Sequence, residues 1–411
     1  MKIYKLISCV LIFILTTACN SNSSINNIDI NDSSNQIVQF DSVDNIRNNI
    51  DTVTKKISNN EYNNIHFKDN YLLNIPNVDS VCSISAKYGT NTVDDIREYT
   101  YNLAKYCYDD VDFSNVFDSE FAISYSDSKK MLFVNKERSS LDFISESMFD
   151  FNSTYLQDDI TVGLSNYSEE EIAYNKAIDL IREYKAKPET FKGKYITTVE
   201  ENIPDIKFDI GGTKVSILEA KKLCENFYNN MPKLYDWYEY ICSDISVYLL
   251  DNNEYIYVID MAASYNGLPI DNTHASYGYN ITNPSSTKIY TGRNESCLLI
   301  DVDDKKPDLV RNYILGIEIN KISSEVTDII TLDYAINSIQ DLVSKYIDFT
   351  IESIELIYSC TYDENINEFI FQPSWKIKGT PYTDSPAFST TIFIDAINGE
   401  QTVLSFPDLQ R

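Results

Sequence analysis

The stretch Thr331–Asp363, TLDYAINSIQDLVSKYIDFTIESIELIYSCTYD, holds the clearest structural pattern in the chain of 411 residues. Its first half places apolar side chains at the i, i+3, i+4 and i+7 spacing of an amphipathic helix. These side chains are Leu332, Ala335, Ile336, Ile339, Leu342, Val343 and Tyr346. Its second half, from Ile354 to Tyr362, alternates apolar and polar residues with the period of two that is typical of a half-buried strand. The stretch therefore predicts a helix followed by a strand on which it packs.

Two other parts of the chain show the same order of one helix followed by strands. Helix starts are expected near Thr92 and Ser216, and Ser216 with Glu219 has the spacing of a capping box. Asp244–Leu250 and Glu254–Ala263 predict two paired strands. The other expected elements are helices at Val43–Ile57 and Glu169–Lys185, and strands at Asp79–Lys87, Phe121–Tyr125, Met131–Asn135, Ser296–Val302, Phe369–Lys378, Ser389–Ala396 and Gln401–Phe406. Together they are compatible with a degenerate repeat.

The C-terminal half contains three short motifs: Tyr265-Asn-Gly-Leu-Pro-Ile270, Pro373-Ser-Trp-Lys-Ile377 and Ile394-Asp-Ala-Ile-Asn-Gly-Glu400. These motifs resemble PepSY-like modules. The layout is also similar to uncharacterised lipoproteins of Gram-positive gut Firmicutes. The resemblance implies an α+β fold of tandem PepSY/cystatin-like modules, each with an amphipathic helix packed on an antiparallel sheet, that serve binding or inhibition. Pro373 also indicates an edge strand or a bulge, because proline cannot donate to a sheet.

The N-terminus has the pattern of a bacterial lipoprotein signal. Lys2 and Lys5 precede a short apolar run to Leu15, and Thr-Thr-Ala then leads to Cys19. Thr16 departs from the usual motif, because leucine is commonest at that place, and a plain secretory signal is the alternative. We expect Cys19 to become the first residue of the mature protein and to carry the lipid. The protein would then be anchored in the cell membrane through its N-terminal lipid and face outside the cytoplasm.

These patterns divide the chain into five expected parts. They are a signal peptide at 1–18, a flexible tether at 19–35, an N-terminal α+β domain with a connecting helix at 36–203, a middle PepSY-like α+β domain at 204–325 and a C-terminal PepSY-like α+β domain at 326–411.

The composition limits the partners that this protein could have. The formal net charge of −28 argues against binding to nucleic acid and against electrostatic adhesion to anionic lipid. Besides Cys9 and Cys19, the chain contains six cysteines: Cys82, Cys107, Cys224, Cys242, Cys297 and Cys360. The sequence does not decide whether they are buried thiols or form disulfides. Their wide spacing and the two histidines disfavour a Cys/His metal site, and we expect no cofactor.

No catalytic motif stands out in the sequence. His66 and His274 lie in polar surroundings typical of surface histidines, and Asp301–Lys306 is interpreted as a charged turn rather than a calcium loop. Trp375, Tyr382 and Phe388 could line an aromatic groove, although packing in the core is favoured. We expect a binding or regulatory protein without catalytic activity that engages a peptide or protein at the cell envelope. Capture of a sugar or peptide nutrient is the alternative, and a carboxylate-based hydrolase ranks last. The oligomeric state stays open.

Overall fold

The fold was examined in a computed structural model of the chain. It describes residues 38–50, 52, 55, 64–89, 93–107, 116–118, 122–126, 131–135, 140–144, 187–198, 200–250, 253–271, 276–278, 288–290, 295–299, 306–313, 317–343, 348–363, 365–382 and 390–405. This part of the chain is a mixed α+β structure in which strands predominate, as the sequence predicts at this level. The signal, the tether and the helix expected at Glu169–Lys185 lie outside the described residues. No helix in the described part is long and apolar enough to cross a membrane.

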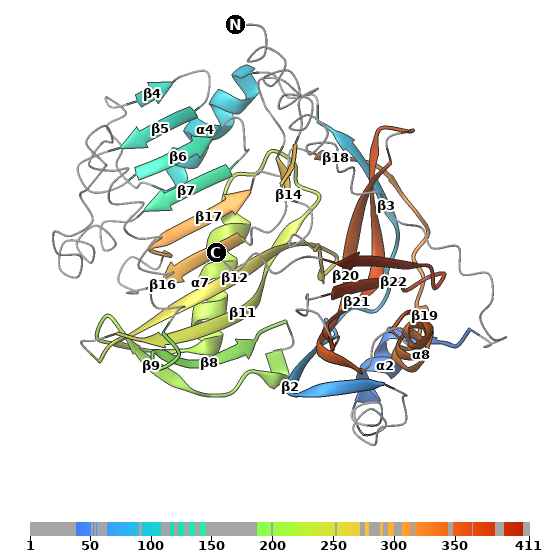
Figure 1. Cartoon of the computed structure of the whole chain (residues 1–411). Helices are drawn as coiled ribbons and strands as arrows, with labels where there is room; N and C mark the ends of the chain where they lie inside the picture. The colour runs from blue at the N-terminus through green and yellow to red at the C-terminus, as the bar shows by residue number, and fades with distance from the viewer. Residues whose placement is uncertain are drawn as a thin grey trace, which may run out of the picture.

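A ten-stranded antiparallel sheet, here called the large sheet, forms one half of the molecule (Figure 1). Its strand order is β4-β5-β6-β7-β17-β16-β12-β11-β8, and β13 pairs with β12. The bounds are β4 Val116–Asp118, β5 Ala122–Ser126, β6 Met131–Asn135, β7 Ser140–Ile144, β17 Leu309–Tyr313, β16 Glu295–Leu299, β12 Tyr255–Tyr265, β11 Glu239–Leu249, β8 Phe191–Ile196 and β13 Leu268–Pro269.

A seven-stranded sheet, here called the small sheet, forms the other half. Its order is β18-β3-β21-β20-β2, with β22 on β21 and β23 on β22. The bounds are β18 Ile317–Ile322, β3 Ile84–Tyr88, β21 Glu368–Tyr382, β20 Asp348–Asp363, β2 Ile65–Asn74, β22 Thr390–Asp395 and β23 Gln401–Ser405. Strands β2 and β20 run parallel, whereas the other named pairs of this sheet are antiparallel.

Three longer helices each precede a set of four strands that lie side by side in one sheet. They are α4 Val93–Cys107 before β4–β7, α7 Ile217–Asn230 before β11, β12, β16 and β17, and α8 Leu332–Val343 before β20–β23. The four strands of each set pair one after another, so each unit is a helix followed by an antiparallel meander. The first two units join through their last strands, because β7 pairs antiparallel with β17.

The helix starts follow local capping chemistry. The Ser216 hydroxyl accepts from the backbone N–H of Glu219, and the Glu219 carboxylate accepts from the backbone N–H of Ser216, so the predicted capping box is confirmed. At α8 the Thr331 hydroxyl accepts from the backbone N–H of Tyr334. Short strand pairs lead into both helices: β9 Lys207–Ile210 with β10 Thr213–Ser216, and β1 Phe40–Ser42 with β19 Asp328–Ile330. The remaining described elements are α2 Val43–Asn48, the 3-10 turn Glu200–Asn202, β14 Ser276–Gly278 and β15 Lys288–Tyr290.

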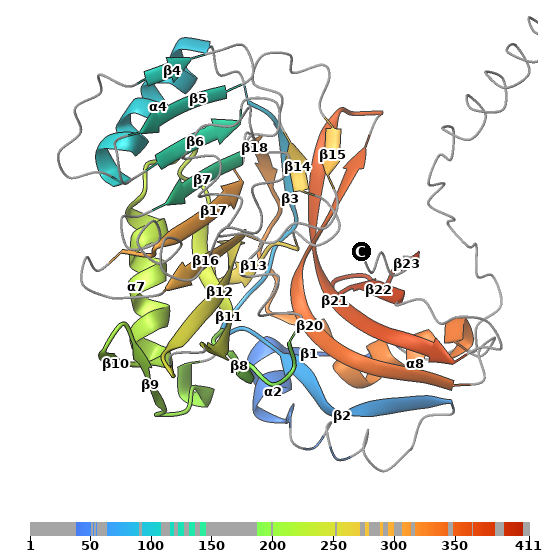
Figure 2. The same cartoon turned by 60° about the vertical axis from the view of Figure 1, so that its left-hand side comes forward.

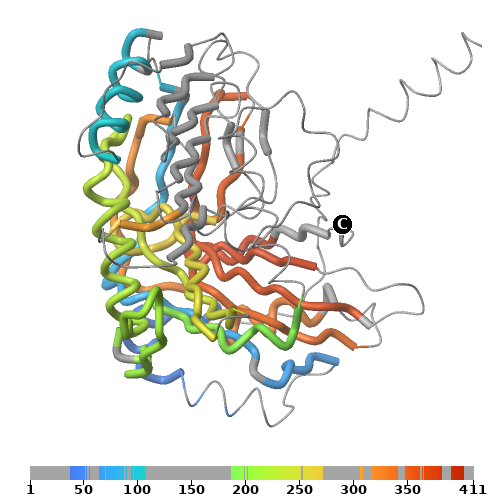
Figure 3. The backbone as a smooth tube through the Cα atoms, turned by 90° about the vertical axis from the view of Figure 1, so that its left-hand side faces the viewer, coloured from blue at the N-terminus to red at the C-terminus, as the bar shows by residue number. Residues whose placement is uncertain are grey.

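The helices cover the sheets on their outer faces. Helices α4 and α7 lie along the same side of the large sheet, and α8 lies against the small sheet (Figures 2 and 3). The Tyr106 hydroxyl of α4 donates to the Phe227 carbonyl of α7 over 2.9 Å. On the small sheet, Trp375 is fully buried, and its indole N–H donates to the Ile330 carbonyl over 2.8 Å. Trp375 therefore belongs to the core.

Direct contacts hold the two sheets together. The Trp237 indole N–H donates to the Ile317 carbonyl over 2.9 Å, and the Trp237 ring lies 5.9 Å from that of Phe371. The backbone N–H of Asp271 donates to the Tyr358 carbonyl over 2.8 Å. The buried apolar cluster continues through residues of both sheets.

The strand pairing differs from the sequence predictions in two respects. Strands β2 and β3 come from the predicted N-terminal domain but pair with β20 and β21, so the small sheet crosses the boundaries expected at 203/204 and 325/326. The interpretation of the Pro373 strand as an edge is wrong, because β21 has neighbours on both sides. The second edge of β21 pairs with β3 up to Phe371 and with β22 from Ser374. The missing N–H of Pro373 thus falls where this edge changes partner.

Candidate functional site

Those residues singled out in the sequence that the structure describes do not meet in one site. Cys19, His274 and Phe388 lie outside the described residues. On β2, His66 Nε2 is 2.9 Å from Asp348 Oδ1, and both side chains are about half-exposed, which fits a surface histidine. Of Asp301–Lys306, the described part begins at Lys306. Within the described ranges, no three His, Cys, Asp or Glu side chains are placed to hold a metal ion together.

The described cysteine side chains are thiols and not members of disulfides. Cys82, Cys107, Cys224 and Cys242 are buried, and Cys360 is half-buried. Burial raises the pKa of the Cys107 thiol to about 12 and that of Cys242 well above its usual range. Such thiols stay protonated near neutral pH and are poor nucleophiles. Cys297 lies on β16.

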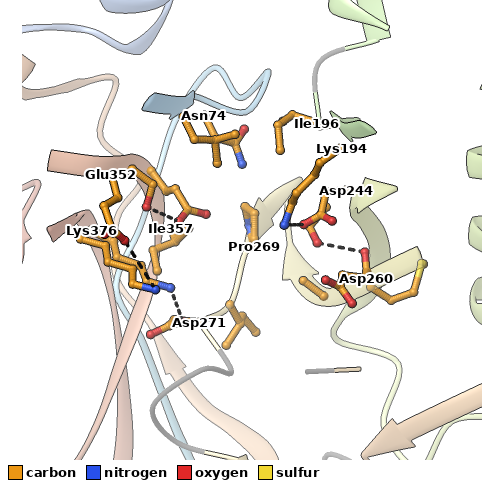
Figure 4. Close-up of a pocket in the computed structure, with 18 residues that line it drawn as sticks. Asn74, Lys194, Ile196, Asp244, Asp260, Pro269, Asp271, Glu352, Ile357 and Lys376 are labelled. Carbon is orange, nitrogen blue, oxygen red and sulfur yellow. Dashed lines mark hydrogen bonds and ion pairs between the residues drawn. The ribbon is translucent and has the colours of Figure 1, made fainter. Parts of the chain in front are cut away.

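A cleft of about 390 Å³ lies between the two sheets and is taken as the candidate site (Figure 4). Its volume falls within the roughly 300–1,000 Å³ of small-molecule sites. Charged side chains come from both walls: Lys194, Asp244 and Asp260 from the large sheet, and Asp271, Glu352, Glu355, Lys376 and Lys378 from the small-sheet side. The five carboxylates exceed the three lysines by two, so the lining is acidic.

The large-sheet wall carries one carboxylate in an unfavourable position. Asp244 on β11 lies directly opposite Asp260 on β12, and like charges in such a cross-strand pair repel. Lys194 on β8 holds Asp244, with Nζ 3.0 Å from Oδ2. Asp244 Oδ1 is buried and has no hydrogen-bond partner among the described residues. This wall therefore contains a desolvated carboxylate with half of its acceptor capacity unused.

The electrostatics of this wall follow from those contacts. Burial raises the pKa of Asp244 from 3.8 to about 6, and the Asp260 carboxylate adds to the increase, while Lys194 opposes it. Burial lowers the pKa of Lys194, but Asp244, Asp260 and Glu355 outweigh burial, so the net change is upward. The two upward shifts of pKa are consistent with each other. Three carboxylates stabilise the charged form of Lys194, whereas only one lysine stabilises the charged form of Asp244, and neighbouring carboxylates destabilise it.

The small-sheet wall contains a buried ion pair. Lys376 Nζ is 2.9 Å from Asp271 Oδ1, and the two side chains are 9% and 4% exposed. Burial lowers the pKa of Lys376, but Asp271 and Glu355 reverse the effect and raise it. Glu355 also lies opposite Lys376 in the register of β20 and β21, and accepts from the Ser353 hydroxyl over 3.3 Å.

The alternation of β20 and β21 places these groups in the cleft. On β20, Ser353, Glu355 and Ile357 line the cleft, whereas Ile354, Leu356 and Tyr358 belong to the apolar core cluster. On β21, Lys376 and Lys378 line the cleft, whereas Trp375 and Ile377 belong to the core cluster. The apolar positions of this alternation predict the strand, and the polar positions, which follow the same period of two, are the ones that line the cleft.

The geometry defines an α+β protein with a charged, solvent-open cleft between two sheets. No family model matches the chain, and no curated protein matches it. Among solved structures, the chain is similar to an uncharacterized protein from Eubacterium rectale ATCC 33656. The identity is 14% and the TM-score 0.48, over 83% of this chain and 91% of that chain. A likeness at this level carries no inference, so the site rests on the geometry of this chain.

Proposed function

We propose that this chain is a lipid-anchored, extracytoplasmic binding and regulatory protein without catalytic activity, and that it engages a peptide or protein partner in the cleft between its sheets. The observation that carries the proposal is this open, charged cleft, lined by side chains from two sheets. The helix-and-meander units are compatible with PepSY-like modules, and the resemblance of the C-terminal half points to binding or inhibition. Lipid on Cys19 would confine the cleft to partners at the cell surface.

A direct binding experiment tests the cleft. Pools of short fluorescent peptides would be titrated with the purified chain, and saturable binding that an unlabelled copy of the peptide competes away is expected. Glu352→Gln serves as a cleft variant, and Glu318→Gln, on β18 away from the cleft lining, serves as its control. Loss of affinity in both variants alike, or no saturable binding by any pool, contradicts the proposal. Thermal stabilisation by sugars without peptide binding would support nutrient capture instead.

The anchor is tested separately. Metabolic labelling with a fatty-acid analogue should label the wild-type protein and leave the Cys19→Ala variant unlabelled. Wild-type protein should also enter the detergent phase of a phase-partition experiment. Label on the Cys19→Ala variant would refute lipidation at this residue without bearing on the cleft.

The hydrolase alternative has one observation in its favour, which is the raised pKa of Asp244 beside Asp260. Glycoside hydrolases place two carboxyl groups on either side of the bond that breaks. Asp244 and Asp260 instead share one wall, and Lys194 holds the first of them. We therefore prefer binding, and turnover of a glycan panel that is lost in Asp244→Asn would overturn this choice.

A further inference from the structure

Lys194 occupies an unusual position in the cleft. Its Nζ lies 3.0 Å from Asp244 Oδ2, and the carboxylates of Asp260 and Glu355 also attract it electrostatically. Carboxylates from both sheets therefore act on one ammonium group. In Figure 4 its side chain reaches from β8 toward Asp244 on the same side of the cleft. The side chain is 45% exposed, whereas that of Asp244 is 12% exposed. The carboxylate is thus enclosed in the wall, whereas nearly half of the lysine side chain faces solvent.

The site beneath Lys194 is already built for a positive charge. Asp244 is buried, and its Oδ1 has no donor among the described residues, which is costly in a desolvated position. The whole lining has an excess of two negative charges. A bound cation with several N–H donors would neutralise part of this excess and could donate to Asp244 Oδ2 in the place of Lys194.

We propose that the cleft binds the ammonium or guanidinium group of a lysine or arginine side chain in the partner peptide, and that Lys194 is an internal substitute which this group displaces from Asp244. The inference rests on the proposed function and names the chemistry of its ligand. Asp244 and Asp260 hold the cation from the large sheet, and Glu355 holds it from the small sheet. The net charge of −28 also favours the approach of a basic partner.

The displacement leads to an unusual expectation. Removing Lys194 should tighten binding, because the incoming cation no longer competes with an internal one. Removing Asp244 should weaken binding, because the site loses its buried charge. Lys378 provides a matched control, since its side chain lines the same cleft, is 47% exposed and lies 4.0 Å from Glu352. Lys194→Met and Lys378→Met change the charge of the lining equally and differ in position alone.

The experiment is fluorescence anisotropy with the purified chain, a lysine-containing peptide selected from the pools and the same peptide with that lysine acetylated. We expect Lys194→Met to bind the basic peptide about three- to tenfold more tightly, Lys378→Met to change affinity less than about twofold, and Asp244→Asn and Glu355→Gln to weaken binding about tenfold or more. The acetylated peptide should bind at least about tenfold more weakly to the wild-type protein.

Binding of the basic peptide should also weaken as the pH is lowered. Lowering the pH from 7.5 to 5 protonates Asp244, whose charge is set by Lys194 on β8, Asp260 on β12 and Glu355 on β20. The affinity of the wild-type protein for the basic peptide should drop several-fold over this range, and that of Asp244→Asn should change less.

Several results would overturn the inference. The inference is refuted if the acetylated peptide binds as tightly as the basic peptide. It is also refuted if Lys194→Met does not increase the affinity for the basic peptide more than Lys378→Met does. If Asp244→Asn does not fold, Glu355→Gln and Lys194→Met decide the question. Peptide binding that ignores the lysine charge refutes this inference alone, whereas absence of any peptide binding refutes the proposed function as well. Spermidine that competes as well as the peptide would overturn the assignment to a peptide side chain.

Discussion

Replacing Asp244 with asparagine should stabilise the protein near neutral pH. The carboxylate is buried opposite Asp260, and the pKa of its carboxyl group rises from 3.8 to about 6 in the folded state. A group whose pKa is raised on folding binds more protons when folded, so the free energy of unfolding falls as the pH rises between these two values. A pKa difference of one corresponds to 1.36 kcal/mol, so the loss amounts to about 3 kcal/mol for Asp244. Because its side chain is 12% exposed, little of this is lost to solvent screening.

Asparagine has nearly the same shape and does not titrate. The free energy of unfolding of Asp244→Asn, minus that of the wild type, should therefore increase by about 3 kcal/mol between pH 3.5 and pH 7. Urea unfolding followed by circular dichroism at steps of half a pH unit measures this difference. Asp209→Asn is the control, because Asp209 is also paired with a lysine on a neighbouring strand, over 3.5 Å, and also has a buried Oδ1 without a partner among the described residues, but its side chain is 35% exposed. For Asp209→Asn, the difference in the free energy of unfolding from the wild type should change by less than about 1 kcal/mol over the same pH range.

The reasoning would be refuted by a difference that stays constant with pH, or by an Asp244→Asn variant that becomes less stable relative to the wild type as pH rises. The second result would mean that attraction to Lys194 outweighs burial and repulsion. If the expected result holds, the wild-type protein keeps a destabilising charge in its cleft. Such a cost is common at binding sites, where function and stability compete.

Three further changes test the fold by urea unfolding at pH 7. Ser216→Ala removes the helix cap of α7 and should lower the free energy of unfolding by about 1 kcal/mol. Trp375→Phe leaves the buried Ile330 carbonyl without its indole donor and should cost about 1–3 kcal/mol, and a loss below about 0.5 kcal/mol would contradict that bond. Gly379→Ala places a Cβ 2.7 Å from the Thr350 carbonyl oxygen and should cost about 1–3 kcal/mol, whereas an unchanged stability would contradict the close packing of β20 and β21.

Local patterns were sufficient to predict several of the elements, although strands such as β2 and β18 were not expected. The helix from Leu332 and the strand through Ile354 follow periodic apolar positions, and Ser216 with Glu219 forms the predicted cap. The order of a helix followed by strands was visible for the same reason. The pairing of β11 with β12, which are joined by a short turn, was predicted, but pairing between distant strands was not. The contact of β7 with β17 depends on complementary edges far apart in the sequence and leaves no local signal.

The candidate site was missed for a related reason. Ser353, Glu355, Lys376 and Lys378 occupy the polar positions of alternating strands, which normally face water. A period of two identifies such a face but cannot tell whether another sheet covers it. Lys376 is buried because Asp271, 105 residues earlier in the chain, comes to lie beside it.

The pairing of β2 with β20 has a consequence for how the protein folds during its synthesis. His66 and Asp348, which meet at this pair, are 282 positions apart. During synthesis from the N-terminus, β2 and β3 must wait with open backbone edges until the last part of the chain has been made. Long-range pairing of this kind slows folding, and open edges invite association with other chains. We therefore expect a chaperone dependence that ends when the final strands emerge, and premature termination before β20 to yield an aggregating product rather than a smaller folded one.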